Sequence, residues 1–139
     1  LTLEYLATHG VPVVSVGQAQ FPAFFTRDSG LNADFQIDDA ASLAAFVTTK
    51  WHLGLNGGVV VANPVPEDHA TPKAEIDAMT EQALREADEQ GVCGKAVTPF
   101  LLARIKQLTG GRSLDTNIAL VKNNARLGAE LAVKLAMLK

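Results

Sequence analysis

A nearly unbroken apolar run, GGVVVANPVP at 57–66, constrains the fold of this chain more than any other stretch. Strands of parallel sheets that are covered by helices on both faces are apolar throughout, without alternation. The run follows a Gly pair and ends at Asn63-Pro64, which is a turn signal. Such a strand needs neighbouring strands and two covering layers, so it predicts an α/β fold.

The remaining segments give the order helix, strand, loop, strand, helix, strand, helix, helix, helix. We expect a short helix ending at Gly10, a strand at 11–17, an ordered aromatic loop at 21–30, a short strand at 34–38, and helices at 38–54, 71–91, 98–111 and from Ser113 or Asp115 onward. Two of these helices open with Thr-Pro, which predicts that Thr71 and Thr98 cap them.

This order is lopsided, because two or three strands face five helical segments. The apolar run at 57–66 needs neighbours on both edges, and no capping residue precedes Leu1. We therefore expect an α/β domain in which chain upstream of Leu1 supplies the amino-terminal half of the sheet. Residues 1–139 would then be the carboxyl-terminal portion of a single domain.

The last helix, TGGRSLDTNIALVKNNARLGAELAVKLA at 109–136, raises the question of its asparagines. Apolar residues spaced by three and four predict one buried stripe, made of Leu114, Ile118, Val121, Ala125, Gly128, Ala132 and Leu135. Asparagine is a mediocre helix former. Asn117 and Asn124 nevertheless lie on one line beside this stripe, with Asn117 expected in the first turn. A structural role and a ligand-binding role for Asn117 are about equally supported by the residues alone.

Composition narrows the function classes. The net charge of −3 gives no basic surface for nucleic acid. The single Cys93 excludes an internal disulfide framework and favours a reducing, cytoplasmic compartment. No apolar run is long enough to span a membrane, so no membrane partner is expected.

No catalytic signature stands out, and the histidines share no spacing that would predict a metal site. Asn63 follows the apolar strand, where open α/β sheets place their ligand crevices, although a turn-forming role is equally supported. Lys95 and Thr98 lie near a predicted helix start and could bind an anion. A plain threonine cap and a solvated lysine explain the same two residues and are favoured.

Five segments together resemble one family. EYLATHGVPV, FPAFFTRDSG, KWHLGLNGGVVVANPVPE, GKAVTPFLLARIKQLTGG and SLDTNIALVKNNA are similar, in order and spacing, to the carboxyl-terminal half of the pseudouridine-5'-phosphate glycosidase, or indigoidine synthase A-like, family. The resemblance implies a three-layer α/β/α fold and a homotrimer. It also implies reversible cleavage of the C–C glycosidic bond of pseudouridine 5'-phosphate into uracil and ribose 5-phosphate, with a divalent metal such as Mn²⁺.

The resemblance also implies a mechanism in which a lysine forms an imine with C1' of the opened ribose and a glutamate donates a proton to the base. That lysine, the glutamate and the metal-binding aspartate would all precede this chain, which we therefore expect to be inactive alone. Asn117 is the one family site residue that carries over, whereas Asn123 and Asn124 are expected to be structural. Two alternatives remain: a relative that joins ribose 5-phosphate to another aromatic acceptor, and a non-catalytic α/β module.

Overall fold

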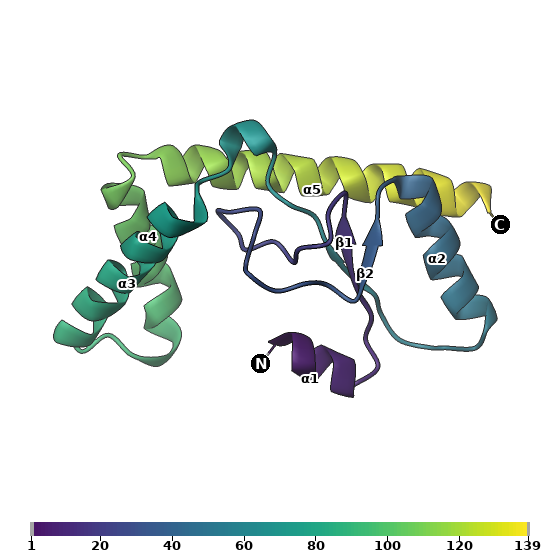
Figure 1. Cartoon of the computed structure of the whole chain (residues 1–139), viewed down its shortest axis with the longest axis horizontal. Helices are drawn as coiled ribbons and strands as arrows, with labels where there is room; N and C mark the ends of the chain where they lie inside the picture. The colour runs from purple at the N-terminus through teal and green to yellow at the C-terminus, as the bar shows by residue number, and fades with distance from the viewer. Residues whose placement is uncertain (1, 139) are drawn as a thin grey trace.

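The computed structural model describes residues 2–138 as a small parallel sheet with helices around it (Figure 1). Its elements are α1 (Thr2–Thr8), β1 (Val13–Val16), β2 (Phe35–Ile37), α2 (Ala40–His52), β3 (Val60–Ala62), the 3₁₀ turn η1 (Glu67–His69), α3 (Lys73–Glu89), the 3₁₀ turn η2 (Gly94–Ala96), α4 (Val97–Leu108) and α5 (Arg112–Met137). The predicted α/β class and the predicted order of elements are confirmed.

The sheet has the order β2-β1-β3, and both pairings are parallel. β1 is the central strand, and Val13, Val14 and Ser15 are fully buried within it. β3, which the sequence predicts to be covered on both faces, is half-buried and pairs only with β1 in the described part of the chain. β3 is therefore more apolar than its partial burial by these neighbours would require.

α2 and α5 frame the sheet. Asp39 caps α2, because its carboxylate accepts hydrogen bonds from the backbone N–H groups of Ala41 and Ser42. These bonds, that of Ser42 foremost, lower the pKa of Asp39. α5 crosses the molecule on the side to which β1 and β2 point, while α1 lies on the opposite side (Figure 1).

The predicted caps of α3 and α4 are wrong. α3 begins at Lys73, and Pro72 takes the cap position, while the N–H of Thr71 instead donates to the carbonyl of Phe25. The turn η2 leads directly into α4, which begins at Val97, so Thr98 already lies inside the helix. The Thr-Pro signal locates both helix starts to within two residues but names the wrong cap in each.

The rotation of α5 about its axis also differs from the prediction. Of the expected buried stripe, Leu114, Ile118 and Val121 are 42%, 44% and 60% exposed. The buried residues of α5 are instead Ser113, Thr116 and Leu120. Polar contacts set this rotation, because the helix is held to η1 and to the residues after β3 by side chains that lie on the Thr116 side.

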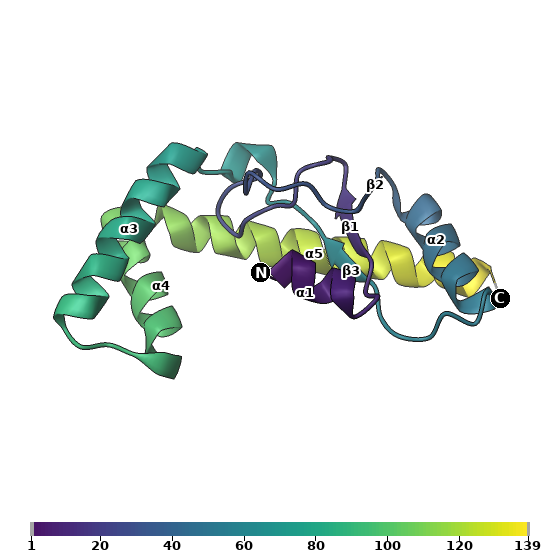
Figure 2. The ribbon, with the colours of Figure 1, turned by 60° about the horizontal axis from the view of Figure 1, so that its bottom comes forward.

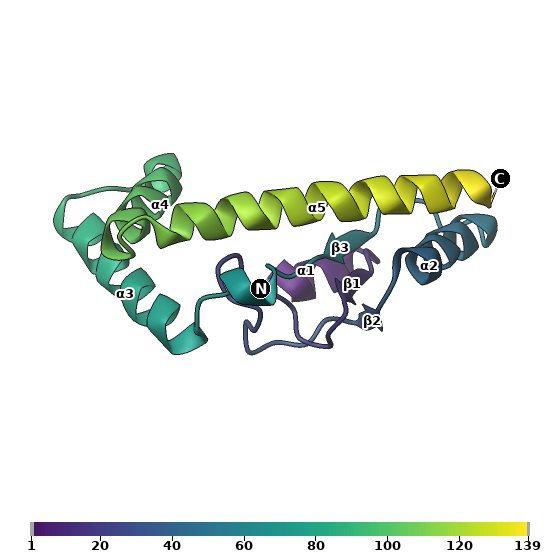
Figure 3. The same ribbon diagram turned by 90° about the horizontal axis from the view of Figure 1, so that it is seen from above.

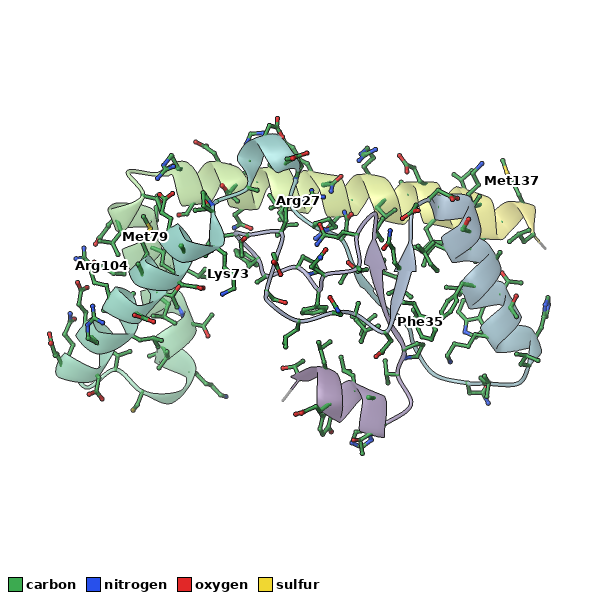
Figure 4. All side chains as sticks on the ribbon, viewed as in Figure 1. Arg27, Phe35, Lys73, Met79, Arg104 and Met137 are labelled. Carbon is green, nitrogen blue, oxygen red and sulfur yellow. The ribbon has the colours of Figure 1, made fainter. Side chains whose placement is uncertain are left out.

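α3 and α4 form a hairpin at one end of the molecule, with Met79 and Arg104 on it (Figure 4). Its core contains Ile76, Ala83, Ile105 and Phe25, with Leu101 packed against them. Phe25 comes from the predicted aromatic loop, so one of its aromatic rings does fill a core, whereas Phe24 remains 49% exposed.

The hairpin is also joined by a forked ion pair between Arg104 and Glu86. Hydrogen bonds from Arg104 lower the pKa of Glu86. The same contact raises the pKa of Arg104. Both groups therefore stay charged throughout the neutral range, and the pair holds α4 against α3.

Candidate functional site

The carboxyl ends of the parallel strands point to the side of the molecule along which α5 runs (Figure 1), and Figure 3 shows α5 lying beside the strands. The residues that follow the strands are Gly17, Asp38 and Asn63. Ligand crevices of open α/β sheets lie outside this edge. Polar side chains gathered there are the first candidates for a site.

The segment after β3 is fastened to α5 by two amides. The Asn63 amide nitrogen donates to Oδ1 of Asn124 at 3.1 Å. The Asn123 amide nitrogen donates to the Pro64 carbonyl at 3.0 Å. Asn123 and Asn124 are therefore structural, as the sequence predicts, and they hold the turn that Asn63 begins.

A third contact comes from the loop after β1. Arg27 donates from Nη1 to the Val65 carbonyl at 2.8 Å, and Figure 4 places Arg27 just beneath α5. Gln18 in turn donates to the Arg27 carbonyl at 2.5 Å. The hydroxyl of the buried Ser15 donates to the Gln20 carbonyl at 2.8 Å. The loops after β1 and β3 thus form one cross-braced polar wall.

Asn117 lies on the same side of α5 and is half-buried. It occupies the second turn rather than the predicted first, because α5 begins at Arg112, directly after Gly110 and Gly111 with positive φ. Its neighbour Thr116 donates to the His69 carbonyl at 2.9 Å, which is one of several contacts that hold α5 in this rotation. Within residues 2–138 the Asn117 amide makes no hydrogen bond, so its donors and acceptor remain available.

Lys95 and Thr98 are exposed and lie at the start of α4. α4 has 12 residues and its other end joins α5, so its start is roughly 18 Å away along the helix. Figure 2 shows this end of the hairpin turned away from the sheet. The structure therefore brings Asn63 together with α5 but does not bring Lys95 or Thr98 to the same place.

Sequence reasoning missed Lys50, the one buried lysine among residues 2–138, at 8% exposure. Its ammonium group donates to the carbonyls of Leu55, Asn56 and Gly57 at 2.6, 3.0 and 3.2 Å. All three of its N–H donors are thereby used. The sequence did contain a signal for this contact, because a lysine in the last turn of a helix can bind the carbonyls that follow the helix. Gly54 and Gly57, with positive φ, let the chain turn back toward Lys50.

Lys50 also lines a cavity of about 1180 Å³ between α1, β2 and α2. The cavity touches Pro12, Asp34, Phe35 and Asn56, which precede or begin the strands, and Figure 4 shows Phe35 at the end of β2 away from α5. Its lining is mostly apolar. It therefore lies at the amino ends of the strands and is separate from the polar wall under α5.

Two features of the described residues limit what the chain can bind or cross. Across residues 2–138, no three His, Cys, Asp or Glu side chains are grouped so that they could hold a metal ion. In the same residues, no helix has both the length and the apolar character needed to cross a bilayer.

Comparisons with known proteins give one consistent result. The sequence profile of the indigoidine synthase A like proteins matches residues 1–134. A protein of Cupriavidus pinatubonensis named pseudouridine-5'-phosphate glycosidase is 64% identical over 98% of this chain and 43% of its own length. A protein of the same name from Geobacillus kaustophilus is 57% identical over 98% of this chain and 45% of its own length.

Solved structures agree. The prealnumycin C-glycosynthase AlnA, determined with ribulose 5-phosphate, has a TM-score of 0.88 at 28% identity, over 97% of this chain and 44% of AlnA. An indigoidine synthase A-like protein of Thermotoga maritima has a TM-score of 0.83 at 36% identity, over 96% of this chain and 44% of its own. The chain thus spans less than half the length of the relatives it matches.

Proposed function

The chain belongs to the indigoidine synthase A-like family, and on this premise we propose that it is the carboxyl-terminal part of a pseudouridine-5'-phosphate glycosidase. The proposed reaction is reversible cleavage of the C–C glycosidic bond of pseudouridine 5'-phosphate into uracil and ribose 5-phosphate. The observation that carries the proposal is the 64% identity to a relative of that name over nearly the whole chain.

Within the proposed enzyme this chain supplies binding groups rather than the reacting ones. Lys50 is unsuited to form an imine, because its three donors are already bound to carbonyls. The lysines at 73, 95, 106, 122 and 134 are exposed and lack the burial that would activate an amine. We therefore propose that none of these lysines forms the imine, that the imine-forming lysine and the proton-donating glutamate lie in the part of the enzyme outside residues 2–138, and that the isolated chain is inactive.

We also propose that the metal is bound by the part of the enzyme outside the described residues. A divalent cation such as Mn²⁺ would supply positive charge at the phosphosugar. The described residues offer no cluster of three ligands, so they do not fit the metal, and its ligands are assigned to the rest of the enzyme.

Asn117 is the residue of this chain that we assign to the substrate. Asn117 is half-buried, and its amide has no hydrogen-bond partner within residues 2–138. It belongs to α5, which runs along the side to which the strands point. An amide donates and accepts at one place, which suits a sugar hydroxyl or the nitrogen of an imine. Such a group stabilises the transition state if the fold holds it in place beforehand.

The test is steady-state kinetics of Asn117→Ala in the full-length enzyme. We expect the rate of uracil release to fall roughly a hundredfold, since one preorganised hydrogen bond contributes about 3 kcal/mol to the transition state. Thr116→Val is the matched control on the adjacent residue. It removes the hydrogen bond to the His69 carbonyl, so it should lower stability by about 1 kcal/mol and leave turnover close to wild type. Near-normal turnover of Asn117→Ala would refute the assignment.

One observation favours a second candidate. The structure of AlnA, a C-glycosynthase determined with ribulose 5-phosphate, superposes on nearly the whole chain with a TM-score of 0.88. A relative that joins ribose 5-phosphate to a different aromatic carbon would use the same sugar-phosphate site. Incubating the enzyme with ribose 5-phosphate and uracil decides between them, because only the glycosidase should form pseudouridine 5'-phosphate in the reverse reaction.

The proposal extends to compartment and assembly. The single Cys93 is exposed and unpaired, which is compatible with the reducing cytoplasm. The exposed Leu114, Ile118 and Val121 form an apolar strip on α5 of the kind that is normally covered. A homotrimer of the full-length enzyme is part of the proposal, and its mass in solution tests it.

A further inference from the structure

The turn after β3 is held more tightly than a connecting loop requires. Pro64 and Val65 are buried, and a side chain from elsewhere binds the carbonyl of each: Asn123 for Pro64 and Arg27 for Val65. Both of these contacts fix the backbone. The third contact, from Asn124, goes to a side chain, the amide of Asn63, and so has a different purpose.

The backbone of Asn63 has little conformational freedom. The residue before a proline is confined to extended conformations, so Pro64 restricts the backbone of Asn63. Asn63 as a residue is half-buried, and its amide donates one N–H to Asn124 in a bond that is exposed to solvent. Its second N–H and its carbonyl oxygen make no other hydrogen bond within residues 2–138. The bond to Asn124 therefore fixes a side chain that still has a donor and an acceptor to offer.

The position of this amide relates it to Asn117. Asn117 and Asn124 are seven residues apart on α5, which places them on one line roughly 10.5 Å apart. Asn63 reaches this line at Asn124, from the carboxyl end of β3. The available amides of Asn63 and Asn117 thus border the same strip of α5, and an extended phosphorylated pentose with a hydrogen bond at each end is long enough to bridge them.

We propose that Asn124 is a positioning residue, which holds the amide of Asn63 so that Asn63 and Asn117 bind the same phosphorylated pentose. This inference rests on the proposed function of the site. It assigns ligand contact to Asn63, and it gives Asn124 no contact with ligand. The phosphosugar is recognised here by neutral amides, which can pair with its hydroxyls without placing a fixed charge beside it.

The roles of the two amides in the Asn63–Asn124 bond suggest the test. Asn124 acts as acceptor, so Asn124→Asp keeps the bond, whereas Asn124→Leu removes it at nearly constant size. In the full-length enzyme we expect Asn124→Leu to weaken ribose 5-phosphate binding and kcat/KM about tenfold, the effect of one lost hydrogen bond. Asn124→Asp should stay within about threefold of wild type, when measured at high salt to screen its added charge.

A double variant separates positioning from direct contact. If Asn124 acts through Asn63, Asn63→Ala combined with Asn124→Leu should bind ribose 5-phosphate no more weakly than Asn63→Ala alone. If the two substitutions instead weaken ribose 5-phosphate binding by the product of their separate effects, the inference is overturned. An Asn124→Asp variant as impaired as Asn124→Leu would overturn it as well. Asn123→Asp is the matched control, because it replaces a donor by a carboxylate facing the Pro64 carbonyl and should lower the melting temperature instead.

Calorimetric binding of ribose 5-phosphate keeps this test separate from the proposed reaction. A wild-type enzyme that binds the sugar phosphate but releases no uracil would refute the proposed function and leave the Asn124 series interpretable. A wild-type enzyme that neither binds ribose 5-phosphate nor releases uracil overturns both.

Discussion

Replacing Lys50 with methionine should destabilise the protein more than any other substitution of a described lysine. Lys50 lies in the last turn of α2, and its ammonium group binds three successive carbonyls of the segment that leads to β3. Cations are favoured at helix carboxyl ends, and here the charge also gathers the exit segment around itself. Methionine keeps the apolar stem and its packing but removes the charge and all three donors.

The magnitude follows from these contacts. A hydrogen bond from a charged donor contributes about 1.5–3 kcal/mol, so three bonds would sum to roughly 4.5–9 kcal/mol if water replaced none of them. Leu55, Asn56 and Gly57 are exposed, so their carbonyls can turn to water once the ammonium group is gone. We therefore expect a loss of about 2–3 kcal/mol in the free energy of unfolding. For a protein of the relatives' length, this corresponds to a fall in melting temperature of roughly 3–5 °C.

The assay is urea unfolding of the full-length protein, followed by circular dichroism, with a thermal melt alongside. Lys50→Arg is the matched control, since a planar guanidinium keeps the charge but cannot direct three donors from one atom. It should fall between wild type and Lys50→Met. A Lys50→Met variant that melts within about 2 °C of wild type would show that the three bonds add nothing beyond what water provides.

Three further outcomes are expected. The purified 139-residue chain should release no uracil above background from pseudouridine 5'-phosphate, as measured by chromatography of the products. Because β3 is half-buried at a sheet edge and α5 exposes Ile118 and Val121, the isolated chain should associate in light scattering, and a clean monomer with a sharp melt would contradict this. Asp39→Ala should lower the melting temperature at neutral pH. Since the folded pKa of Asp39 is lowered, the stabilisation is present above the unfolded carboxyl pKa and is lost as pH falls through the folded value, so the two melting curves should converge in acid.

The order of elements could be predicted because local chemistry marks it. Asp39 caps α2, Gly10 and Gly54 end helices with positive φ, and Asn63-Pro64 ends β3. Each signal acts within a few residues of the boundary that it determines. The parallel sheet could be predicted as well, because a strand that is apolar throughout is typical of parallel sheets covered on both faces.

The rotation of α5 could not be predicted, because hydrophobic spacing supports more than one buried face. Leu120, Leu127 and Leu131 lie on the buried or half-buried side, while Leu114 and Ile118 are exposed. Both sets have helical spacing. Contacts with segments 47 to 61 residues away in sequence decide between them, and no local pattern reveals such partners.

The same long-range contacts explain the asparagines of α5. A helix that must bind the backbone and side chains of a neighbouring turn needs both donors and acceptors on short side chains. Asn123 donates to a carbonyl, whereas Asn124 accepts from an amide, and the same side-chain type serves both. Lysine could only donate and glutamate could only accept, and either would add a charge beside the polar wall. Among the described asparagines of α5, Asn117 is the one whose amide has no hydrogen-bond partner, and this difference supports the proposal that it binds the ligand.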